Sequence, residues 1–351
     1  MPARTATEAT ASGVVICGAG PVGCALALAL RGSPHRVALA DAGAPPAGSR
    51  PIALSHASRL ILERLGAWEG LAATPIETVH VSQAGAFGQT RLEACEAGVP
   101  ALGYVVDYAA LSQTLRAATA GLHAGHSAAQ LTVHAEGFSA EAREKRYGQE
   151  ALVGVVDLAK PARATAFERF TPDGPVALLP TSGRYALIWT VPAGRGAALV
   201  GLPAGEFMEE LSRALGPRIG RVIGVEARNA HPLVLRVRRT RTAERAVHIG
   251  NAAQTLHPVA GQGLNLGLRD AWDLAQFLRN AADPGAGEVL ARYGATRRFD
   301  ALATILVTDL LAATGAIARM QRSAALAALE ALPPVRKFFA RRMIFGPSAL
   351  P

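Results

Sequence analysis

The sequence feature that most constrains the fold is a hydrophobic run that enters a glycine-rich turn close to the N-terminus. Val14–Gly23 reads VVICGAGPVG, and the alanine- and leucine-rich residues Cys24–Leu30 predict a helix directly after it. This is the strand, tight turn and helix start of a dinucleotide-binding fold, in which glycines let the backbone approach a pyrophosphate. Gly18, Gly20 and Gly23 would form that turn. The alternative is a tight strand-to-helix connection without any ligand, since the same glycine pattern also arises for that reason.

A second strand is predicted over Arg36–Ala40, and it ends at Asp41. In a dinucleotide-binding fold an acidic residue at about this point accepts hydrogen bonds from a ribose hydroxyl. Asp also favours turns at strand ends, and Asp41 precedes Ala42 and Gly43, so a purely local turn is the alternative interpretation.

The second informative segment lies far along the chain, at Val247–Asp270 (VHIGNAAQTLHPVAGQGLNLGLRD). A strand-like run gives way to a loop rich in Pro and Gly, and a long helix is predicted to begin near Leu264. Gly261 and Gly263 would bring bare backbone close to a ligand, and Asn265 adds a polar side chain at the helix start. The unpaired amides of such a terminus suit an electron-rich group on a ligand ring. An Asn-capped surface helix after a proline turn is the alternative.

Together these segments resemble the class A flavoprotein aromatic hydroxylases, which combine an N-terminal GxGxxG with a distant G-D/N-A-A-x-x-x-x-P-x-x-G-Q-G-x-N-x-G-x-x-D. The loop looks like the ubiquinone-biosynthesis branch, and its Asn251, Gln254 and His257 are similar to the 2-octaprenyl-6-methoxyphenol hydroxylases. Further matches lie along most of the chain, at Arg50–Ser55 (RPIALS), Leu65–Trp68 (LGAW), Thr78–Ser82 (TVHVS), Ala166–Phe170 (AFERF) and Gly174-Pro175.

The resemblance implies an α/β fold, with a Rossmann-like FAD-binding domain, an inserted antiparallel β-sheet substrate domain and C-terminal helices. The FAD-binding domain would comprise residues 13–139 and 240–290, and the substrate domain residues 150–239. Alternating short β runs between Pro/Gly turns, such as Ala151–Leu158, Val176–Leu179 and Arg184–Pro192, support the inserted sheet. Residues 291–351 would form the helical end of the chain.

The resemblance also implies which residues hold FAD. The first three glycines would line the pyrophosphate, Asp41 would bind the ribose, and Arg50 would contact the dinucleotide. Asn251 would lie near the ribityl and pyrophosphate, where an uncharged amide avoids repelling the phosphates. The loop after it would follow the edge of the isoalloxazine ring. The complete implied set is Gly18, Gly20, Gly23, Asp41, Arg50, Asn251, Pro258, Gly261, Gln262, Gly263, Leu264 and Asn265.

Two departures from the family pattern bear on this expectation. Members carry an Asp-Gly motif followed by Ser, whereas Leu131–Ser139 (LTVHAEGFS) has Glu136 in place of the Asp. The chain between the predicted helix Ala109–Ala118 and Leu131 is a short polar linker, where relatives have several strands. Three explanations stay open: a domain that tolerates the shortening, a sequence that lacks residues, or a protein that binds FAD poorly.

Composition narrows the class of protein. The 351 residues are 50% hydrophobic and 5% aromatic, with a formal net charge of +9, which allows a sizeable core and suggests two domains. Few aromatic residues and no zinc-knuckle or RNP-like pattern argue against a nucleic-acid partner. The three cysteines, Cys17, Cys24 and Cys95, are widely spaced, and the positions of Cys17 and Cys24 in the predicted strand and helix indicate packing roles in a reducing cytosol. The scattered histidines predict no metal site. No secretory signal is predicted at the N-terminus.

The C-terminal region predicts contact with a membrane surface. Ala301–Met320 is strongly apolar, and Val335–Phe345 (VRKFFARRMIF) mixes basic with aromatic residues, a pattern typical of helices at an anionic bilayer interface. No run reaches the roughly 18 apolar residues of a spanning helix. We therefore expect a cytoplasmic protein, peripheral at the inner face of the membrane. Docking of these helices on the protein's own core or a second subunit is the alternative.

The resemblance implies an FAD-dependent monooxygenase that hydroxylates a polyprenylated methoxyphenol through a flavin C4a-hydroperoxide. O₂ would be the co-substrate, NAD(P)H the electron donor, and other ubiquinone-biosynthesis proteins potential partners. The protein then needs few catalytic side chains. No catalytic residue is identified beyond the weak candidate His257, and Phe167 and Phe170 are candidates for the apolar pocket. The alternatives are a catalytically impaired scaffold homologue and a hydroxylase of a soluble aromatic compound.

Overall fold

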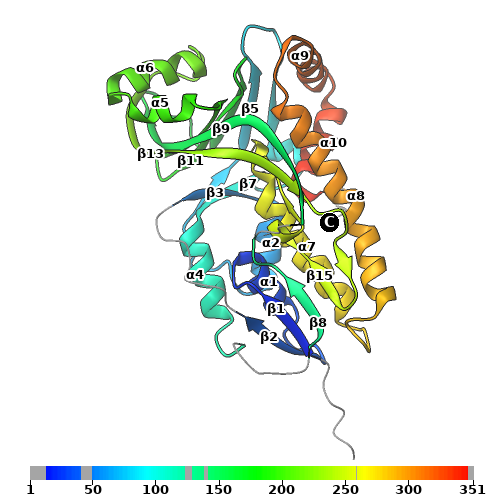
Figure 1. The fold of residues 1–351 in the computed structure, drawn as a ribbon. Coiled ribbons are helices and arrows are strands. Elements are labelled where there is room, and N and C mark those ends of the chain that lie inside the picture. The colour runs from blue at the N-terminus through cyan, green and yellow to red at the C-terminus, as the bar shows by residue number, and fades with distance from the viewer. Residues whose placement is uncertain (1–12, 41–49, 123–128, 138–140, 258, 347–351) are drawn as a thin grey trace, which may run out of the picture.

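The computed structural model describes residues 13–40, 50–122, 129–137, 141–257 and 259–346. The chain forms a small, mostly parallel sheet with helices on it, a large sheet stacked beyond it, and a C-terminal helical region (Figure 1). The helices of the last region run along one side of both sheets (Figure 1). The predicted α/β class with a Rossmann-like part is confirmed.

The central sheet places the two predicted glycine-rich segments side by side. β1 pairs in parallel with β2 and with β8, and β15 pairs in parallel with the other edge of β8. Both segments therefore leave their strands at the same edge of the sheet. Across the sheet the strands are β14 (Thr242–Ala243), β15 (Ala246–His248), β8 (Ala129–His134), β1 (Gly13–Cys17) and β2 (Arg36–Ala40).

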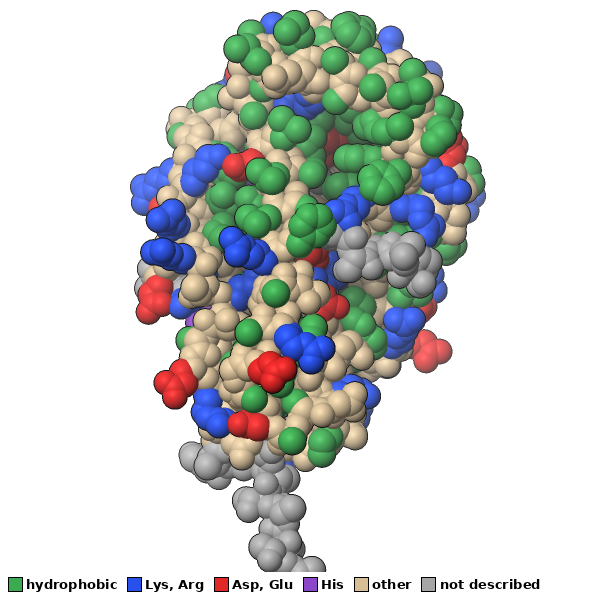
Figure 2. Space-filling view, turned by 90° about the vertical axis from the view of Figure 1, so that its right-hand side faces the viewer, with side chains coloured by type: hydrophobic (Ala, Val, Ile, Leu, Met, Phe, Trp, Pro, Cys, Tyr) green, Lys and Arg blue, Asp and Glu red, His purple; other side chains and the backbone are tan. Residues whose placement is uncertain are grey.

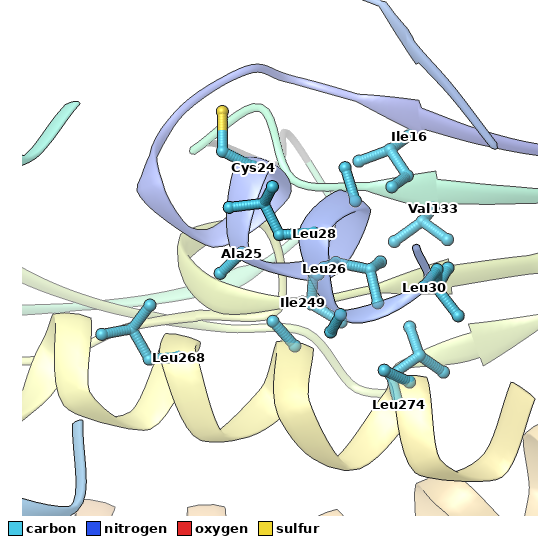
Figure 3. Packing of buried hydrophobic residues seen from close by; sticks show 14 of the residues in the cluster. Ile16, Cys24, Ala25, Leu26, Leu28, Leu30, Val133, Ile249, Leu268 and Leu274 are labelled. Atoms are coloured by element: carbon cyan, nitrogen blue, oxygen red, sulfur yellow. The ribbon is translucent and has the colours of Figure 1, made fainter. Parts of the chain in front are cut away.

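Two helices follow these strands and bury their apolar faces against them. α1 (Pro21–Ala29) is apolar on all sides and almost wholly buried, as expected of a helix enclosed by other elements. α7 (Gln262–Leu278) packs along it, and Figure 3 shows Leu26 and Leu30 of α1 among residues of the strands and of α7. This packing fixes where both helix N-termini lie.

The large sheet carries the substrate region, with one difference from the expected organisation. β5 (Thr78–Gln83) and β6 (Gln89–Glu93) belong to it although they precede residue 150, and β10 (Thr165–Phe170) pairs with β5 in parallel. The sheet is therefore mixed, and the boundaries 13–139 and 150–239 do not separate the layers. The other strands, in order from the far edge, are β16 (Gln254–Thr255), β13 (Val222–Val237), β9 (Arg143–Leu158), β12 (Arg184–Pro192) and β11 (Pro175–Thr181).

The two faces of the large sheet have different neighbours. On one face α5 (Arg195–Gly201) and α6 (Ala204–Leu215) cover a core that includes Trp189 and Phe207. The opposite face turns toward the central part of the molecule and the C-terminal helices. A three-stranded sheet connects the layers and consists of β3 (Pro51–Ser55), β7 (Gly103–Asp107) and β4 (Ala73–Ile76), with α2 (His56–Arg64), α3 (Ala94–Ala97) and α4 (Tyr108–Ala118) beside it.

The C-terminal helices are α8 (Gly287–Ala312), α9 (Ala316–Ala331) and α10 (Pro333–Phe345). α10 docks on the body, because Arg336 forms an ion pair with Glu96 (2.6 Å) and Arg341 donates to the carbonyl of Ala97 (2.9 Å). Part of the basic tail thus binds the protein itself. Within the described chain no single helix is long and apolar enough to cross a bilayer; α8 and α9 reach that measure only as a pair bent by 113°.

The shortened segment does not prevent closure of the central sheet. α4 ends at Ala118 and β8 begins at Ala129, and β8 still pairs with both β1 and β15. The part of the linker that is described, residues 119–122, contains no strand. The strand carrying Glu136 at its end therefore occupies the centre of the sheet despite the short connection.

Gly23 should be essential for this arrangement. A Cβ at Gly23 would lie 1.9 Å from the carbonyl oxygen of Gly18, a clash with backbone that cannot move without opening the turn. We expect Gly23→Ala to reduce the free energy of unfolding by about 1–3 kcal/mol, as over-packing does in other cores. Urea unfolding measures this. Gly205→Ala in α6, where a Cβ meets nothing within 4 Å, is the matched control and should lose no stability; equal midpoints for the two variants would contradict the packing argument.

Candidate functional site

One large cavity, about 1410 Å³ in volume, connects the edge of the central sheet with the inner face of the large sheet and the C-terminal helices. Its lower part is lined by Gly18–Val22, by Arg50, and by the loop that leads into α7. Its upper part is lined by side chains of β9, β10, β11 and β12 and of α8, α9 and α10. The two parts differ in chemistry, the first being rich in backbone amides and the second apolar.

The three N-terminal glycines serve two different purposes. Gly18 has φ +104°, and a Cβ there would lie 2.7 Å from the carbonyl of Ala135, so this glycine lets β1 and β8 end close together. Gly23 keeps α1 close to the turn. Gly20, by contrast, has nothing within 4 Å of a Cβ position and lines the cavity, so its missing side chain leaves room for a ligand.

The start of α1 is suited to an anion. Gly20 is the N-cap residue and offers no side chain to the first amides, Pro21 takes the first helical position, and the first turn has no acidic residue. The unpaired N–H groups of a helix start carry partial positive charge and favour a phosphate. The predicted position of the pyrophosphate therefore fits this end of the cavity.

The second glycine loop interlocks with the first around Val22. A Cβ at Gly250 would lie 3.2 Å from Val22, and one at Gly267 would lie 2.7 Å from it. Gly250 (φ +58°) and Gly261 (φ +59°) have the left-handed backbone conformation that favours glycine. Gly263, at the start of α7, has nothing within 4 Å of a Cβ position and lines the cavity, as Gly20 does.

Asn265 has a structural role that the sequence did not reveal. Its Oδ1 accepts hydrogen bonds from the Ser55 amide (2.8 Å) and the Ser58 hydroxyl (2.7 Å). Its Nδ2 donates to the carbonyls of Ala53 (3.1 Å) and Gly261 (2.7 Å). The residue lines the cavity as predicted, yet its side-chain amide is engaged with protein and cross-links α7 to the β3–α2 turn.

Asp270 holds the second glycine loop in place through hydrogen bonds. It was not among the predicted site residues. It is fully buried in α7, and its carboxylate accepts from the amide of Gly250 (3.1 Å) and from Gln254 Nε2 (2.8 Å). Arg241 (3.2 Å) and Arg297 (2.8 Å) form ion pairs with it. Burial alone would raise its pKa, but the two guanidinium groups outweigh burial and hold the pKa of Asp270 below its usual range. The only sequence signal was the Asp that closes the loop motif.

The remaining predicted residues are distributed as follows. Arg50 lies over the ring of Tyr108 (4.4 Å to the ring centre) at the wall of the cavity, and Asn251, Gln262 and Leu264 also line it. Asp41 and Pro258 lie outside the described residues, so their predicted roles stay predictions.

Glu136, the residue that departs from the family pattern, also lines the cavity. Its carboxylate bonds to His134 Nδ1 (3.0 Å), and the ring of His134 stacks on that of His248 (4.5 Å between centres). Ligand atoms of Cys17, His134 and Glu136 lie within 4.8 Å of one another. The pairing of β1 with β8 brings Cys17 to His134 and Glu136, and the sequence prediction of no metal site stays a prediction.

His257 is buried (1% exposed) at the junction of the two parts of the cavity, against the ring of Tyr147. Its Nδ1 accepts a hydrogen bond from the amide of Val259 (3.1 Å), which leaves the proton of the neutral ring on Nε2. Burial lowers the pKa of His257 to about 4. Near neutral pH the ring therefore carries its proton on a buried Nε2 that has no hydrogen-bond partner among the described residues. It is poorly suited to remove a proton.

The two predicted pocket phenylalanines lie on opposite faces of β10, because side chains alternate along a strand. Phe170 packs with Val259 and Leu326 on the cavity side. Phe167 belongs to the outer core with Tyr185 and α6. Both residues line the cavity, but only Phe170 packs on its inner side, whereas the side chain of Phe167 belongs to the outer core.

The described residues fit FAD. The lower part of the cavity combines a helix start suited to pyrophosphate, two glycines whose Cβ positions are open, and a second helix start beside it. Residues that would hold the cofactor include Gly20, Arg50, Asn251 and Gly263. The upper, apolar part leaves space for a second ligand next to the bound flavin.

Comparison with known proteins agrees with this geometry. Residues 121–306 match the family model described as an FAD binding domain. The ubiquinone hydroxylase UbiL of Rhodospirillum rubrum is 32% identical over 379 residues, covering 93% of this chain and 88% of that protein. The 3-demethoxyubiquinol 3-hydroxylase of Escherichia coli is 29% identical, covering 82% and 84%.

Solved structures support the fold. The p-nitrophenol 4-monooxygenase PnpA of Pseudomonas putida superposes with a TM-score of 0.73 at 16% identity, covering 95% of this chain and 97% of that chain. HpxO of Klebsiella pneumoniae, solved with FAD and uric acid, superposes with a TM-score of 0.70, covering 95% and 96%.

Gly20→Ala should separate cofactor binding from stability. The Gly20 backbone (φ −73°, ψ 176°) accepts any residue, and a new Cβ meets no protein atom, so the unfolding midpoint should not change. The methyl group would project into the cofactor space, and we expect the dissociation constant for FAD to rise about tenfold, equivalent to roughly 1.4 kcal/mol. Titration of flavin fluorescence measures this. Gly287→Ala, equally open but away from the cavity, serves as the control, and tight binding by Gly20→Ala would contradict the assigned pyrophosphate position.

Asp270→Asn should destabilise the fold strongly. The variant keeps the shape of the side chain but removes the charge that Arg241 and Arg297 share. Arg297 keeps its ion pairs with Asp273 (2.7 Å) and Asp300 (2.6 Å), so we expect a loss of about 3 kcal/mol, at the lower end of the range for buried pairs. Because the folded-state pKa of Asp270 is lowered, its contribution is present above about pH 4 and is lost as pH falls through that lower pKa. Urea unfolding at pH 7 provides the measurement. The control Asp283→Asn removes a surface pair with Arg245 (2.8 Å) and should cost at most about 1 kcal/mol; a similar loss in both variants would refute the anchoring role.

Proposed function

Because the chain belongs to the ubiquinone-biosynthesis branch of the class A FAD-dependent aromatic hydroxylases, we propose that its substrate is a polyprenylated methoxyphenol. The enzyme class itself, an FAD-dependent monooxygenase, follows from the family. The observation that supports this substrate is the form of the cavity, which joins a cofactor cradle to an apolar chamber that opens among exposed apolar side chains.

The apolar chamber lies between the large sheet and the C-terminal helices. Small and aliphatic side chains cover its sheet side, and larger aliphatic and aromatic ones cover its helix side. A ring bearing an isoprenoid tail would bury apolar surface on both sides, at about 25 cal/mol per Å². The lining includes Val153, Val155, Ala166, Ala177, Leu179, Ala186 and Ile188 from the sheet, and Val307, Leu311, Leu326, Leu329, Phe339 and Met343 from the helices.

The chamber reaches the surface between α8 and α9. Leu310 lines the cavity and is also 54% exposed, and Gln321 and Ala325 of α9 are likewise exposed and cavity-lining. Figure 2 shows apolar side chains gathered around a hollow on this face of the molecule. We use the term apolar rim for the exposed residues Phe299, Leu302, Leu306, Leu310, Ile317, Met320, Leu332, Val335 and Phe338.

The apolar rim supports a peripheral position on the inner face of the cytoplasmic membrane. Contiguous exposed apolar surface of this kind marks an interaction site. Arg298, Arg319 and Lys337 are exposed on the same three helices and would meet anionic lipid headgroups. The isoprenoid tail would then pass between bilayer and chamber beside Leu310, and the ring would enter first toward the flavin.

Bound FAD would supply the activation of O₂, with electrons from NAD(P)H as the proposed donor. The protein's own part is positional. The loop from Gly261 to Leu264 would hold the edge of the flavin ring, and the inner face of the large sheet would hold the substrate ring beside it and exclude water. His257 keeps its Nε2 proton buried and without a partner among the described residues, so its part at the cavity wall is one of packing.

The proposed activity is tested with the purified, FAD-loaded protein, NAD(P)H, O₂ and a methoxyphenol that carries a short isoprenoid chain. We expect one oxygen from O₂ in the product and a lower KM with the prenylated phenol than with the unprenylated one. Turnover of small soluble phenols without any preference for the prenylated compound would favour a soluble substrate. Tight FAD binding without turnover of either compound would favour a non-catalytic role.

Replacing apolar rim residues should weaken membrane binding without affecting the fold. Leu306 and Ile317 are 68% and 71% exposed, and burial of such a side chain contributes about 1.5–3 kcal/mol. We expect the double variant Leu306→Ser/Ile317→Ser to reduce partitioning into vesicles containing anionic lipid at least tenfold in a sedimentation assay. The control is Ile223→Ser on β13, an apolar residue 52% exposed outside the rim. Unchanged partitioning of the double variant would count against the membrane position.

A further inference from the structure

Glu168 is a carboxylate in an otherwise apolar wall of the cavity. It lies on β10 between Ala166 and Phe170, which share its face of the strand, and all three line the chamber. The residue is partly exposed, and it is among those that line the cavity. Its position is therefore open to a ligand in the chamber.

The carboxylate lacks the partners that a structural buried acid requires. Its Oε1 is inaccessible and accepts no hydrogen bond from the described residues. The charged group that faces it is Arg322 of α9, but that guanidinium donates to Gln83 Oε1 (2.8 Å) and to the carbonyls of Leu311 (3.2 Å) and Ala313 (2.9 Å). An unpaired buried acid is costly, which is why such groups concentrate at functional sites.

Four other titratable side chains in or beside the cavity are less suitable for removing a proton from a substrate. Glu136 is bonded to His134 beside the cofactor cradle, and His257 uses Nδ1 as an acceptor and presents a proton. His231 of β13 is exposed. Tyr147, next to His257, donates its hydroxyl to Asp309, and that carboxylate also binds Lys145 (2.7 Å).

On this basis, and resting on the proposed function, we propose that Glu168 is the general base that removes the phenolic proton of the substrate. In this step the O–H bond of the phenol breaks, its electron pair stays on the phenolate oxygen, and the proton passes to the carboxylate of Glu168. The phenolate is the more electron-rich ring and accepts oxygen more readily. The proton leaves to water before the next turnover, so no redox reagent enters this step.

The electrostatic environment matches this task. Burial raises the pKa of Glu168 to about 7, against the opposing effect of Arg322. A base whose pKa lies near the working pH is deprotonated in a large fraction of molecules and still binds a proton well. An ordinary Glu, with a pKa near 4.3, would bind the proton too weakly. Arg322 would in turn stabilise the negative charge as it moves from the carboxylate to the phenolate.

The test uses Glu168→Gln in the FAD-loaded protein, with a 2-methoxyphenol bearing one isoprenoid unit as the probe. General-base catalysis contributes about 10²–10⁴-fold, so kcat/KM near pH 7 should fall at least about 100-fold. The native profile should rise with pH through about 7 as Glu168 loses its proton. The variant should lack this inflection and recover activity only toward the pKa of a free phenol, about 10.

A second readout does not depend on turnover. The infrared carbonyl band of a protonated carboxyl group distinguishes neutral Glu168 from its carboxylate, and in the native protein with bound probe that band should disappear with a midpoint near pH 7. In Glu168→Gln the titrating band should be missing. The matched control is Glu144→Gln on β9, an acid paired with Arg146 and Arg236 outside the cavity, which should retain the native profile.

The outcomes separate this proposal from the proposed function. If the native protein hydroxylates the probe and Glu168→Gln keeps the same pH profile and the same titrating carboxyl band, the role of Glu168 is overturned. If the native protein binds FAD but neither binds nor hydroxylates the probe, the substrate class fails instead. Should Glu168→Gln not fold, the native infrared titration alone decides, because a probe complex without a carboxyl band that titrates near pH 7 excludes a neutral-pH base.

Discussion

The buried carboxylate of Asp270 is the interaction on which the cofactor end of the molecule depends. It joins the amide of Gly250, the side chain of Gln254 and the guanidinium groups of Arg241 and Arg297 at one point beneath α7. Removing an unpaired carboxylate from water would cost free energy and oppose folding. The two guanidinium groups and the two neutral donors offset this desolvation cost. Because the network fixes the turn after β15 and the start of α7 together, the second glycine loop faces the cavity in one conformation.

The first glycine loop is fixed by packing, and Val22 joins the two. Gly250 and Gly267 bring backbone against its side chain, while Gly18 and Gly23 close the turn before it. These close approaches leave the open glycines, Gly20 and Gly263, facing the same cavity. Some glycines are therefore required for close packing, and the others leave space for the cofactor. The short connection between α4 and β8 does not change this arrangement.

The C-terminal helices combine the two roles that their sequence allowed. Buried residues such as Ala340 and Ile344 pack α10 on the body, and Arg336 binds Glu96, as a docked helix requires. The opposite surfaces of α8, α9 and α10 stay apolar and exposed around the mouth of the chamber. The same helices form a wall of the apolar chamber and carry the apolar rim. A substrate that enters between α8 and α9 would therefore pass the apolar rim.

The sequence by itself determined the family, the strand-turn-helix at Gly18–Gly23 and the helix after Gly263, because these depend on local backbone geometry and periodicity. The tertiary structure decided what local pattern does not encode. It placed β5 and β6 in the large sheet, made Asn265 a cross-link, packed Phe167 into the outer core, and brought Asp270 to Arg297. It also left Glu168 without a hydrogen-bond partner at Oε1 among the described residues. The burial of these residues and their contacts with distant segments arise only when the layers of the fold pack together. A local sequence pattern therefore does not predict them.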